Sequence, residues 1–121
     1  MRKKVLIVDD AETIVMMERM ILGKTYEVVT ARNGVEAVEK AVAEMPDLIL
    51  LDVVMPMLGG IETCRQLREK AETREIPIIM VSTRSESASV DASYESGCSA
   101  YVTKPINGSE LLSKVKSFIG V

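Results

Sequence analysis

Short apolar runs alternate along the chain with longer segments in which apolar residues recur every three or four positions. Three of these runs have four consecutive apolar residues and are typical of central parallel strands buried on both faces: Val5–Val8, Leu48–Leu51 and Ile78–Val81. Two weaker runs, Tyr26–Ala31 and Ser99–Thr103, predict strands nearer the edges of the same sheet.

The segments between the runs have the period of amphipathic helices. The apolar positions that carry this pattern are Ile14, Met17 and Ile21; Val35, Val38 and Val42; Ile61, Cys64 and Leu67; and Leu111, Leu112, Val115, Phe118 and Ile119. Asn33 and Asn107 are expected to cap the second and last helices. The segment Glu86–Ser96 has few apolar residues, so the fourth helix, ended by Gly97, is predicted to be the least stable.

Five strands that alternate with five helices predict an α/β fold. We expect a doubly wound, five-stranded parallel sheet with helices on both faces and right-handed crossovers. The 121 residues fit one domain, so residues 1–121 are expected to form a single unit. The formal net charge of -3 argues against a nucleic-acid-binding surface, which needs a concentrated basic patch.

Composition also bears on compartment. Cys64 and Cys98 lie in apolar patterns without CxxC pairing, which indicates packed, reduced thiols. A zinc site is disfavoured because the chain has no histidine. The run Val5–Val8 is too short for a signal peptide, and no stretch approaches the roughly 18 apolar residues of a membrane span. We therefore expect a cytoplasmic protein without membrane contact.

Two further patterns have more than one interpretation. Met16, Met17 and Met20 could form a pliable binding face, but their helical spacing favours packing in the core. Gly59–Gly60 lacks the flanking signature of a phosphate-binding loop, and a tight turn into the third helix explains it.

Polar residues that could take part in a reaction or bind a ligand lie where the predicted strands end. Asp9 and Asp10 follow the first strand, Asp52 follows the third, Ser82 ends the fourth and Lys104 ends the fifth. The carboxyl ends of parallel strands share one edge of a sheet, where ligands bind in open α/β folds. These five residues are therefore predicted to converge on one small site.

This set of groups suits phosphoryl transfer to a carboxylate. Three adjacent carboxylates resist ionisation unless a cation joins them, and Mg²⁺ prefers such oxygen ligands. Lys104 adds a fixed positive charge and Ser82 a hydroxyl donor, so Asp52 could act as the nucleophile. Taken singly, an Asp after a strand is as often a helix cap, and a lone Lys or Ser is usually solvated or structural.

In this order and spacing, the motifs closely resemble those of the response-regulator receiver family, the CheY-like phosphoacceptor domains of two-component signalling, over essentially the whole chain. The motifs are Asp9-Asp10, Asp52-x-x-Met55-Pro56-x-x-x-Gly60, Ser82 after an apolar strand, and Tyr101-x-x-Lys104-Pro105. The resemblance, and not the periodicity, implies the flavodoxin-like strand order 2-1-3-4-5.

The resemblance also implies how each residue acts. Asp52 would become the aspartyl phosphate. Asp10 would ligate Mg²⁺ directly, Asp9 largely through water, and the backbone carbonyl of Val54 would be a further ligand.

On the opposite side of the implied site, Lys104 would pair with the phosphoryl oxygens. Ser82 would move toward the phosphoryl group, and Tyr101 would follow from an exposed to a buried position. A cis peptide is expected at Lys104–Pro105.

The implied partners are a histidine kinase or a histidine phosphotransfer protein, since this chain has no histidine to act as donor, and a downstream target protein bound in trans. The fourth helix, fifth strand and fifth helix would form the switching face. A monomer is expected, with dimerisation through that face as the alternative. The chain would be a switch and not an enzyme, catalysing only its own phosphorylation and slow dephosphorylation.

Three residues depart from the family pattern: Thr83 replaces a usual Ala or Gly, Val54 has no polar group to orient water, and Arg84 is cationic. From these we predict slow self-hydrolysis. The alternatives are a phosphohydrolase resembling the haloacid dehalogenases, a degenerate receiver that is never phosphorylated, and a flavodoxin-type electron carrier. The first would need an acid at Val54, the second an incomplete acidic pocket, and the third aromatic loop residues beside a flavin.

Overall fold

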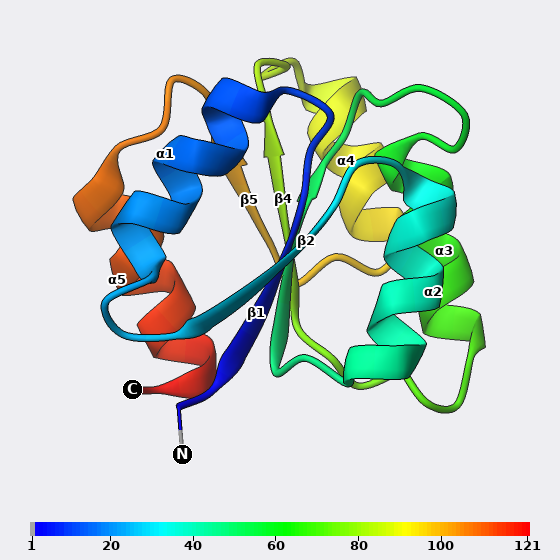
Figure 1. Cartoon of the computed structure of the whole chain (residues 1–121). Helices are drawn as coiled ribbons and strands as arrows, with labels where there is room; N and C mark the ends of the chain where they lie inside the picture. Colours follow the sequence, from blue (N-terminus) through cyan, green and yellow to red (C-terminus); the bar gives the residue numbers. More distant parts are fainter. Residues whose placement is uncertain (1) are drawn as a thin grey trace.

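Strands and helices alternate throughout the computed structural model, which describes residues 2–121 (Figure 1). In this range the elements are β1 (Lys4–Val8), α1 (Glu12–Leu22), β2 (Glu27–Ala31), α2 (Gly34–Glu44), β3 (Leu48–Asp52), α3 (Gly60–Glu69), β4 (Ile78–Ser82), α4 (Ser87–Glu95), β5 (Ala100–Thr103) and α5 (Gly108–Ile119). All neighbouring strands pair in parallel, in the order β2-β1-β3-β4-β5. The predicted doubly wound sheet and its strand order are confirmed.

The sheet separates two apolar cores. Helices α1 and α5 cover one face, and α2, α3 and α4 cover the other. Consecutive strand residues point to opposite faces, so Ile49 and Leu51 of β3 pack toward α2 and α3, whereas Leu48 and Leu50 pack toward α1 and α5. A strand covered on both sides needs apolar residues at every position, which explains the continuous runs in the sequence.

The predicted helix ends are also present. The Asn33 side chain accepts a hydrogen bond from the Glu36 backbone N–H at 2.9 Å, and Asn107 accepts one from the Glu110 N–H at 3.0 Å. Helix α4 has no side-chain cap and buries only Ser93, in line with its poor apolar stripe. The Lys104–Pro105 peptide bond is cis, as expected.

The prediction that the methionines of α1 pack in the core is wrong. Met16, Met17 and Met20 are 59%, 43% and 76% exposed. The stripe of α1 that faces the sheet instead contains a buried carboxylic acid, Glu18, followed by the buried Leu22. Glu18 occupies a sheet-facing position, where an apolar residue is expected. The apolar pattern therefore predicted a rotation of α1 about its axis that would turn the methionines inward, and the structure does not have this rotation. Phe118 of α5, also placed on an apolar stripe, is 41% exposed.

The tight turn predicted before the third helix brings α3 against the end of β3. Gly60 is the first residue of α3, and a Cβ atom there would lie 2.2 Å from the backbone oxygen of Asp52. Only glycine permits this approach without displacing backbone. The turn therefore fixes the position of the strand end that carries Asp52.

Candidate functional site

The strand ends place the predicted polar residues on one edge of the sheet. Asp52 and Ser82 are the last residues of β3 and β4, and Asp9 and Lys104 directly follow β1 and β5. Asp9, Asp52 and Ser82 are buried, while Lys104 is partly buried. Because the paired strands are parallel and in register, residues far apart in sequence meet here.

Three carboxylates form the acidic side of this site. Asp9, Asp10 and Asp52 each offer one carboxylate oxygen, and these atoms all lie within 4.8 Å of one another. Asp10 is exposed and the other two are buried, so the cluster opens to solvent on one side. A set of hard, anionic oxygens at this spacing fits a divalent cation such as Mg²⁺.

Lys104 forms the basic side. Its Nζ lies 3.1 Å from Asp9 Oδ2 and 3.5 Å from Asp52 Oδ1, with the side chain 14% exposed. Burial by itself disfavours the charged ammonium, yet the pKa of Lys104 is raised, since the hydrogen bond to Asp9 and the neighbouring carboxylates outweigh that cost. The amine therefore stays protonated and holds a positive charge between two acids.

The surroundings of Asp52 disfavour the ionised form of its carboxyl group. Burial, followed by the charge of Asp9, raises the pKa of Asp52 to about 6, although Lys104 and the Val54 backbone N–H act in the opposite direction. That N–H donates to Asp52 Oδ1 at 3.4 Å. The single positive charge of Lys104 thus does not offset the burial of Asp52 and the negative charge of Asp9. A further cation near the cluster would favour the ionised form of Asp52.

Asp9 also forms the kind of local turn that a strand-end Asp often forms. Its Oδ1 accepts a hydrogen bond from the Ala11 backbone N–H at 2.9 Å, just before α1 begins. Its other oxygen faces Lys104. Asp9 is therefore a turn former and a site residue at once, and helix α1, whose N-cap is Ala11, has no side-chain cap.

Ser82 and Tyr101 are both bonded to the backbone of one residue in the loop after β4. Ser82 Oγ accepts from the Arg84 N–H at 3.0 Å, and the Tyr101 hydroxyl donates to the Arg84 carbonyl oxygen at 2.7 Å. Tyr101 is partly buried and packs against the core on the α2–α4 side. This loop therefore connects the site to β5.

The three residues that depart from the family pattern are exposed and lie in the loops that follow β3 and β4. Val54, two positions after Asp52, has 54% exposure. Thr83 and Arg84 are exposed as well, and Arg84 forms a 3.6 Å ion pair with Glu86. Asp10 is likewise exposed, as the solvent-facing member of the acidic cluster.

Sequence reasoning missed Glu18. This side chain is 2% exposed, and burial, followed by the charge of Asp9, raises its pKa to about 8. The sequence does contain a signal, because Glu18 lies three positions after Val15 and four before Leu22, on the stripe of α1 that packs toward the sheet. An acid at such a position interrupts an apolar stripe.

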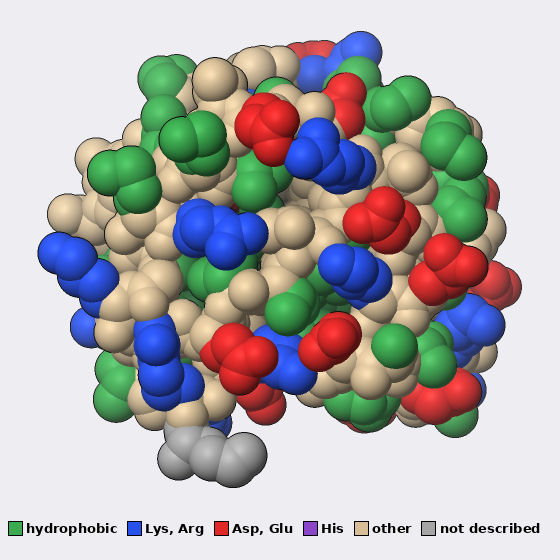
Figure 2. All heavy atoms as spheres, in the orientation of Figure 1, with side chains coloured by type: hydrophobic (Ala, Val, Ile, Leu, Met, Phe, Trp, Pro, Cys, Tyr) green, Lys and Arg blue, Asp and Glu red, His purple; other side chains and the backbone are tan. Residues whose placement is uncertain are grey.

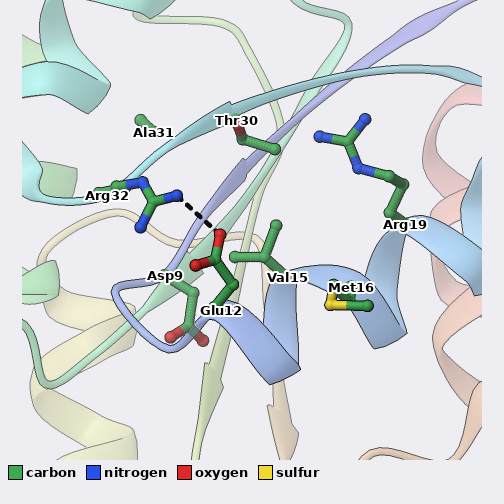
Figure 3. A pocket seen from close by; sticks show the side chains of 8 residues that line it. All are labelled: Asp9, Glu12, Val15, Met16, Arg19, Thr30, Ala31 and Arg32. Carbon is green, nitrogen blue, oxygen red and sulfur yellow. Dashed lines mark hydrogen bonds and ion pairs between the residues drawn. The ribbon is translucent and has the colours of Figure 1, made fainter.

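A small cavity of about 150 Å³ lies beside the site, between α1 and β2 (Figure 3). Asp9 lines it together with the Glu12–Arg32 ion pair, whose atoms are 2.7 Å apart, and Arg19 lies across the cavity from that pair. The acidic cluster itself does not enclose this space, since neither Asp10 nor Asp52 lines it.

The outer surface is mixed in charge. On the face shown in Figure 2, acidic and basic side chains alternate with hydrophobic ones, and no extended basic patch covers the described part of this face. Cys64 and Cys98 are buried free thiols, as predicted. Across residues 2–121, no helix has the length and apolar character needed to cross a bilayer.

Fold and site together define a doubly wound α/β domain with an acidic cluster and a lysine at the strand ends, and comparison with known proteins identifies its family. The family model described as "Response regulator receiver domain" matches residues 5–116, so the chain belongs to the receiver-domain family of two-component systems. Phosphoryl acceptance is the general function of this family, whose members act as signalling switches between histidine kinases and downstream effectors. The resemblance drawn from the motifs is confirmed.

Individual relatives agree with this assignment. The chain is 42% identical to the alkaline phosphatase synthesis transcriptional regulatory protein PhoP of Bacillus subtilis, over 98% of this chain and 49% of PhoP. It is 36% identical to the polar-differentiation response regulator DivK of Brucella anthropi, over 99% of this chain and 98% of DivK. The chemotaxis protein CheY4 of Vibrio cholerae has a TM-score of 0.93 at 32% identity, covering 98% of this chain and 100% of that chain. The chain thus spans about half of PhoP and nearly all of DivK.

Proposed function

We propose that Asp52 of this receiver accepts a phosphoryl group from the phosphohistidine of a kinase or phosphotransfer protein. The observation that carries the proposal is the contact of Lys104 Nζ with both Asp52 and Asp9, 3.5 and 3.1 Å away, beside three clustered carboxylates. A nucleophilic carboxylate next to a fixed ammonium and an acidic metal-type cluster matches what phosphoryl transfer requires.

In the proposed step, a carboxylate oxygen of Asp52 attacks the phosphorus atom. The new P–O bond forms as the P–N bond to the donor imidazole breaks, and the leaving nitrogen takes that electron pair. Lys104 neutralises a phosphoryl oxygen, and the hydroxyl of Ser82 donates to another after it leaves the Arg84 N–H. Asp52 must be ionised to react, so a further positive charge near the cluster favours the step by lowering its pKa.

Mg²⁺ is the cofactor that we propose for this site. Asp10 and Asp9 would hold it, together with Asp52 and the backbone carbonyl of Val54. The fit rests on the donor set, in which three carboxylate oxygens lie within 4.8 Å of one another, and burial together with the charge of Asp9 raises the pKa of Asp52. When bound, the ion would supply positive charge to the phosphoryl oxygens.

The output would be a shift between two conformations of the α4–β5–α5 face. Ser82 and Tyr101 are the proposed switch residues, and the support is their shared attachment to the Arg84 backbone. When Ser82 turns toward the phosphoryl group it releases the Arg84 N–H, which frees the loop that also holds the Tyr101 hydroxyl. The change would then reach α4, the helix with the fewest buried side chains.

The remaining features of the proposal follow the sequence-based expectations. The chain would act in the cytoplasm as a switch that turns over only its own phosphoryl group, read in trans by a downstream protein. It would be monomeric when unphosphorylated. Dimerisation through the α4–β5–α5 face is the alternative, and sedimentation before and after phosphorylation distinguishes the two.

The direct test is incubation with acetyl phosphate and Mg²⁺, followed by intact mass spectrometry. We expect a base-labile adduct of one phosphoryl group that is absent in the matched variant Asp52→Asn and absent without Mg²⁺. Hydrolysis of acetyl phosphate without an accumulating adduct would favour a phosphohydrolase. No adduct and no hydrolysis would favour a degenerate receiver.

A further inference from the structure

Helix α4 is exposed where it begins and buried where it ends. It begins after β4, at the end of the sheet that carries the site, and runs back to the opposite end, because β4 and β5 are parallel (Figure 1). The six consecutive residues Thr83–Ala88 are all exposed. Toward the other end of the helix and just beyond it, Ser93, Ser96 and Cys98 are buried. The two ends of α4 are therefore attached to the protein very differently.

Arg68 of α3, the helix beside α4 in Figure 1, holds the C-terminal end of α4. Its Nε donates to the carbonyl oxygen of Gly97, just past α4, at 2.8 Å, and its Nη2 donates to Ser99 Oγ at 3.4 Å. Its Nη1 donates to the carbonyl oxygens of Arg74 and Ile76, at 3.0 and 2.6 Å, in the loop before β4. One guanidinium thus joins the segments that lead into two neighbouring strands.

Close packing accompanies these hydrogen bonds. Gly97 has a φ of +108°, and a Cβ atom there would lie 2.7 Å from Arg68 Cγ, so the backbone approaches the arginine stem at a position that favours glycine. A further bond, from Cys64 Sγ to the Ser96 carbonyl oxygen at 3.5 Å, ties the same end of α4 to α3. The four hydrogen bonds that Arg68 donates in the described chain use the planar fork of donors that only a guanidinium has.

We propose that Arg68 makes Ser96–Ser99 a fixed pivot, so that phosphorylation of Asp52 moves the loop after β4 and the first turns of α4 about it. The inference rests on the proposed function of Asp52, and it specifies which part of the output face responds. Without the anchor, the whole of α4 would shift, and the response would extend to the segment that leads into β5.

The moving end is the one that the site can reach. The backbone of Arg84, bonded to Ser82 and Tyr101, lies two positions before the N-cap residue Glu86. These are single hydrogen bonds in an exposed loop, and they can exchange when Ser82 turns. At Gly97 the donor is a charged group, and such hydrogen bonds are roughly twice as strong as those between neutral groups. A displacement that starts in this loop therefore meets its strongest resistance at the far end of α4.

The test is hydrogen exchange of the full chain with and without acetyl phosphate and Mg²⁺, measured separately for residues 83–90 and 96–99. In the wild type, phosphorylation should change exchange in 83–90 and leave 96–99 as it was. Asp52→Asn, treated in the same way, should show neither change.

Arg68→Met keeps an unbranched stem and removes every donor. Even without phosphorylation, its residues 96–99 should exchange roughly tenfold faster than in the wild type, because the loss of one hydrogen bond from a charged donor corresponds to about that factor. On phosphorylation, exchange should now change in both segments. Arg68→Lys, which keeps the charge but not the fork, should show the same spread to a smaller extent. It decides the question if Arg68→Met also loses the protection of β1 and β3 and is therefore not folded.

Arg65→Met is the matched control, since Arg65 lies on the same helix but is exposed and pairs with Glu62 at 3.0 Å. Its two segments should behave as in the wild type. A phosphorylated wild type in which 96–99 responds as strongly as 83–90, or in which neither responds, would overturn the inference and leave Asp52 phosphorylation intact. The same holds if the response of the folded Arg68 variants stays confined to 83–90, or if Arg65→Met matches Arg68→Met. A wild type that forms no adduct would instead overturn the proposed function, and the pivot with it.

Discussion

At the scale of single residues, the site combines charges that oppose each other. Asp52 and Glu18 both have raised pKa values because burial and the charge of Asp9 act on each of them. Lys104 compensates only in part. The fold therefore holds unfavourable charge at the end of the sheet, which is typical of sites where function and stability compete.

Glu18 should make stability depend on pH. Its pKa is about 8 in the folded chain against an ordinary value of 4.5, so the folded state binds the proton more tightly and the free energy of unfolding falls as the pH rises from 4.5 toward 8. Glu18→Leu should therefore stabilise the protein more at pH 8 than at pH 5, by a few kcal/mol at roughly 1.4 kcal/mol per pKa unit. Urea unfolding at the two pH values measures this. An equal gain at both would contradict it.

Val54 should determine how long the phosphoryl group lasts. Its exposed apolar side chain lies two residues after Asp52 and offers no hydrogen bond to orient an attacking water. Val54→Asn should speed loss of the phosphoryl group, because its side-chain amide could orient the attacking water. Decay of the purified adduct, followed by intact mass, gives the rate, and Val54→Ala is the control for side-chain size. A rate in Val54→Asn that equals or falls below that of wild type would count against this role.

At the scale of elements, two connections govern the site. The turn into α3 packs against the backbone of Asp52 and fixes its position. The loop after β4 links Ser82 to Tyr101 through the Arg84 backbone. One is rigid, since backbone touches backbone at Gly60, and the other consists of single hydrogen bonds that can exchange. We interpret the first as the support of the site and the second as its route to the output face.

Gly60 should tolerate no side chain. A methyl group there would meet the Asp52 carbonyl oxygen at 2.2 Å, so Gly60→Ala must push α3 away from β3. We expect a loss of about 1–3 kcal/mol in the free energy of unfolding, together with slower phosphorylation. Gly59→Ala is the neighbouring control, because its added Cβ would lie 3.8 Å from the nearest atom, an ordinary contact. Equal stabilities for the two variants would show that α3 is not held as described.

Helix α4 should be the least protected helix. It is nine residues long, has no side-chain cap and buries only Ser93. Its amides should exchange with solvent faster than those of β1, β3 and β4, and their rates should change when Asp52 carries a phosphoryl group. Hydrogen exchange with and without acetyl phosphate measures both. Protection equal to that of the central strands, unchanged by phosphorylation, would remove α4 from the proposed switch.

At the scale of the whole molecule, Mg²⁺ should stabilise the folded chain, because the carboxylates that would bind it come together only on folding. At a hundredfold excess over its dissociation constant the gain is about 2.7 kcal/mol. Thermal unfolding with increasing MgCl₂ measures it, with NaCl of matched ionic strength as the control. Asp10→Asn should lose most of the effect, since it removes one of the three clustered oxygens. An equal rise in the variant would assign the stabilisation to general screening.

Much of the fold was predictable because its signals are local. Runs such as Leu48–Leu51 identify strands covered on both faces, and Asn33 and Asn107 mark helix starts. The grouping of Asp9, Asp10, Asp52 and Lys104 followed from strand ends alone, because a parallel sheet brings those ends together. The strand order needed the family resemblance.

What the sequence did not predict depends on how α1 is rotated about its axis. Apolar spacing placed the methionines inward and overlooked Glu18, because periodicity treats an acid as a polar, outward residue. Only the tertiary packing of α1 on the sheet reveals that the acid faces the core. The attachment of Ser82 and Tyr101 to one backbone unit was also inaccessible, since it depends on loop geometry.

The exposed methionines of α1 have a practical consequence for watching the protein in solution. Their methyl groups lie on the α1 surface, whereas Met80 is completely buried in the core on the opposite side of the sheet. Isotope labelling of methionine methyls alone would therefore place native NMR reporters in both halves of the molecule without altering its sequence. A binding partner that contacts α1 would shift the methyl signals of the exposed methionines there. A conformational change in the interior of the protein would instead shift the signal of Met80.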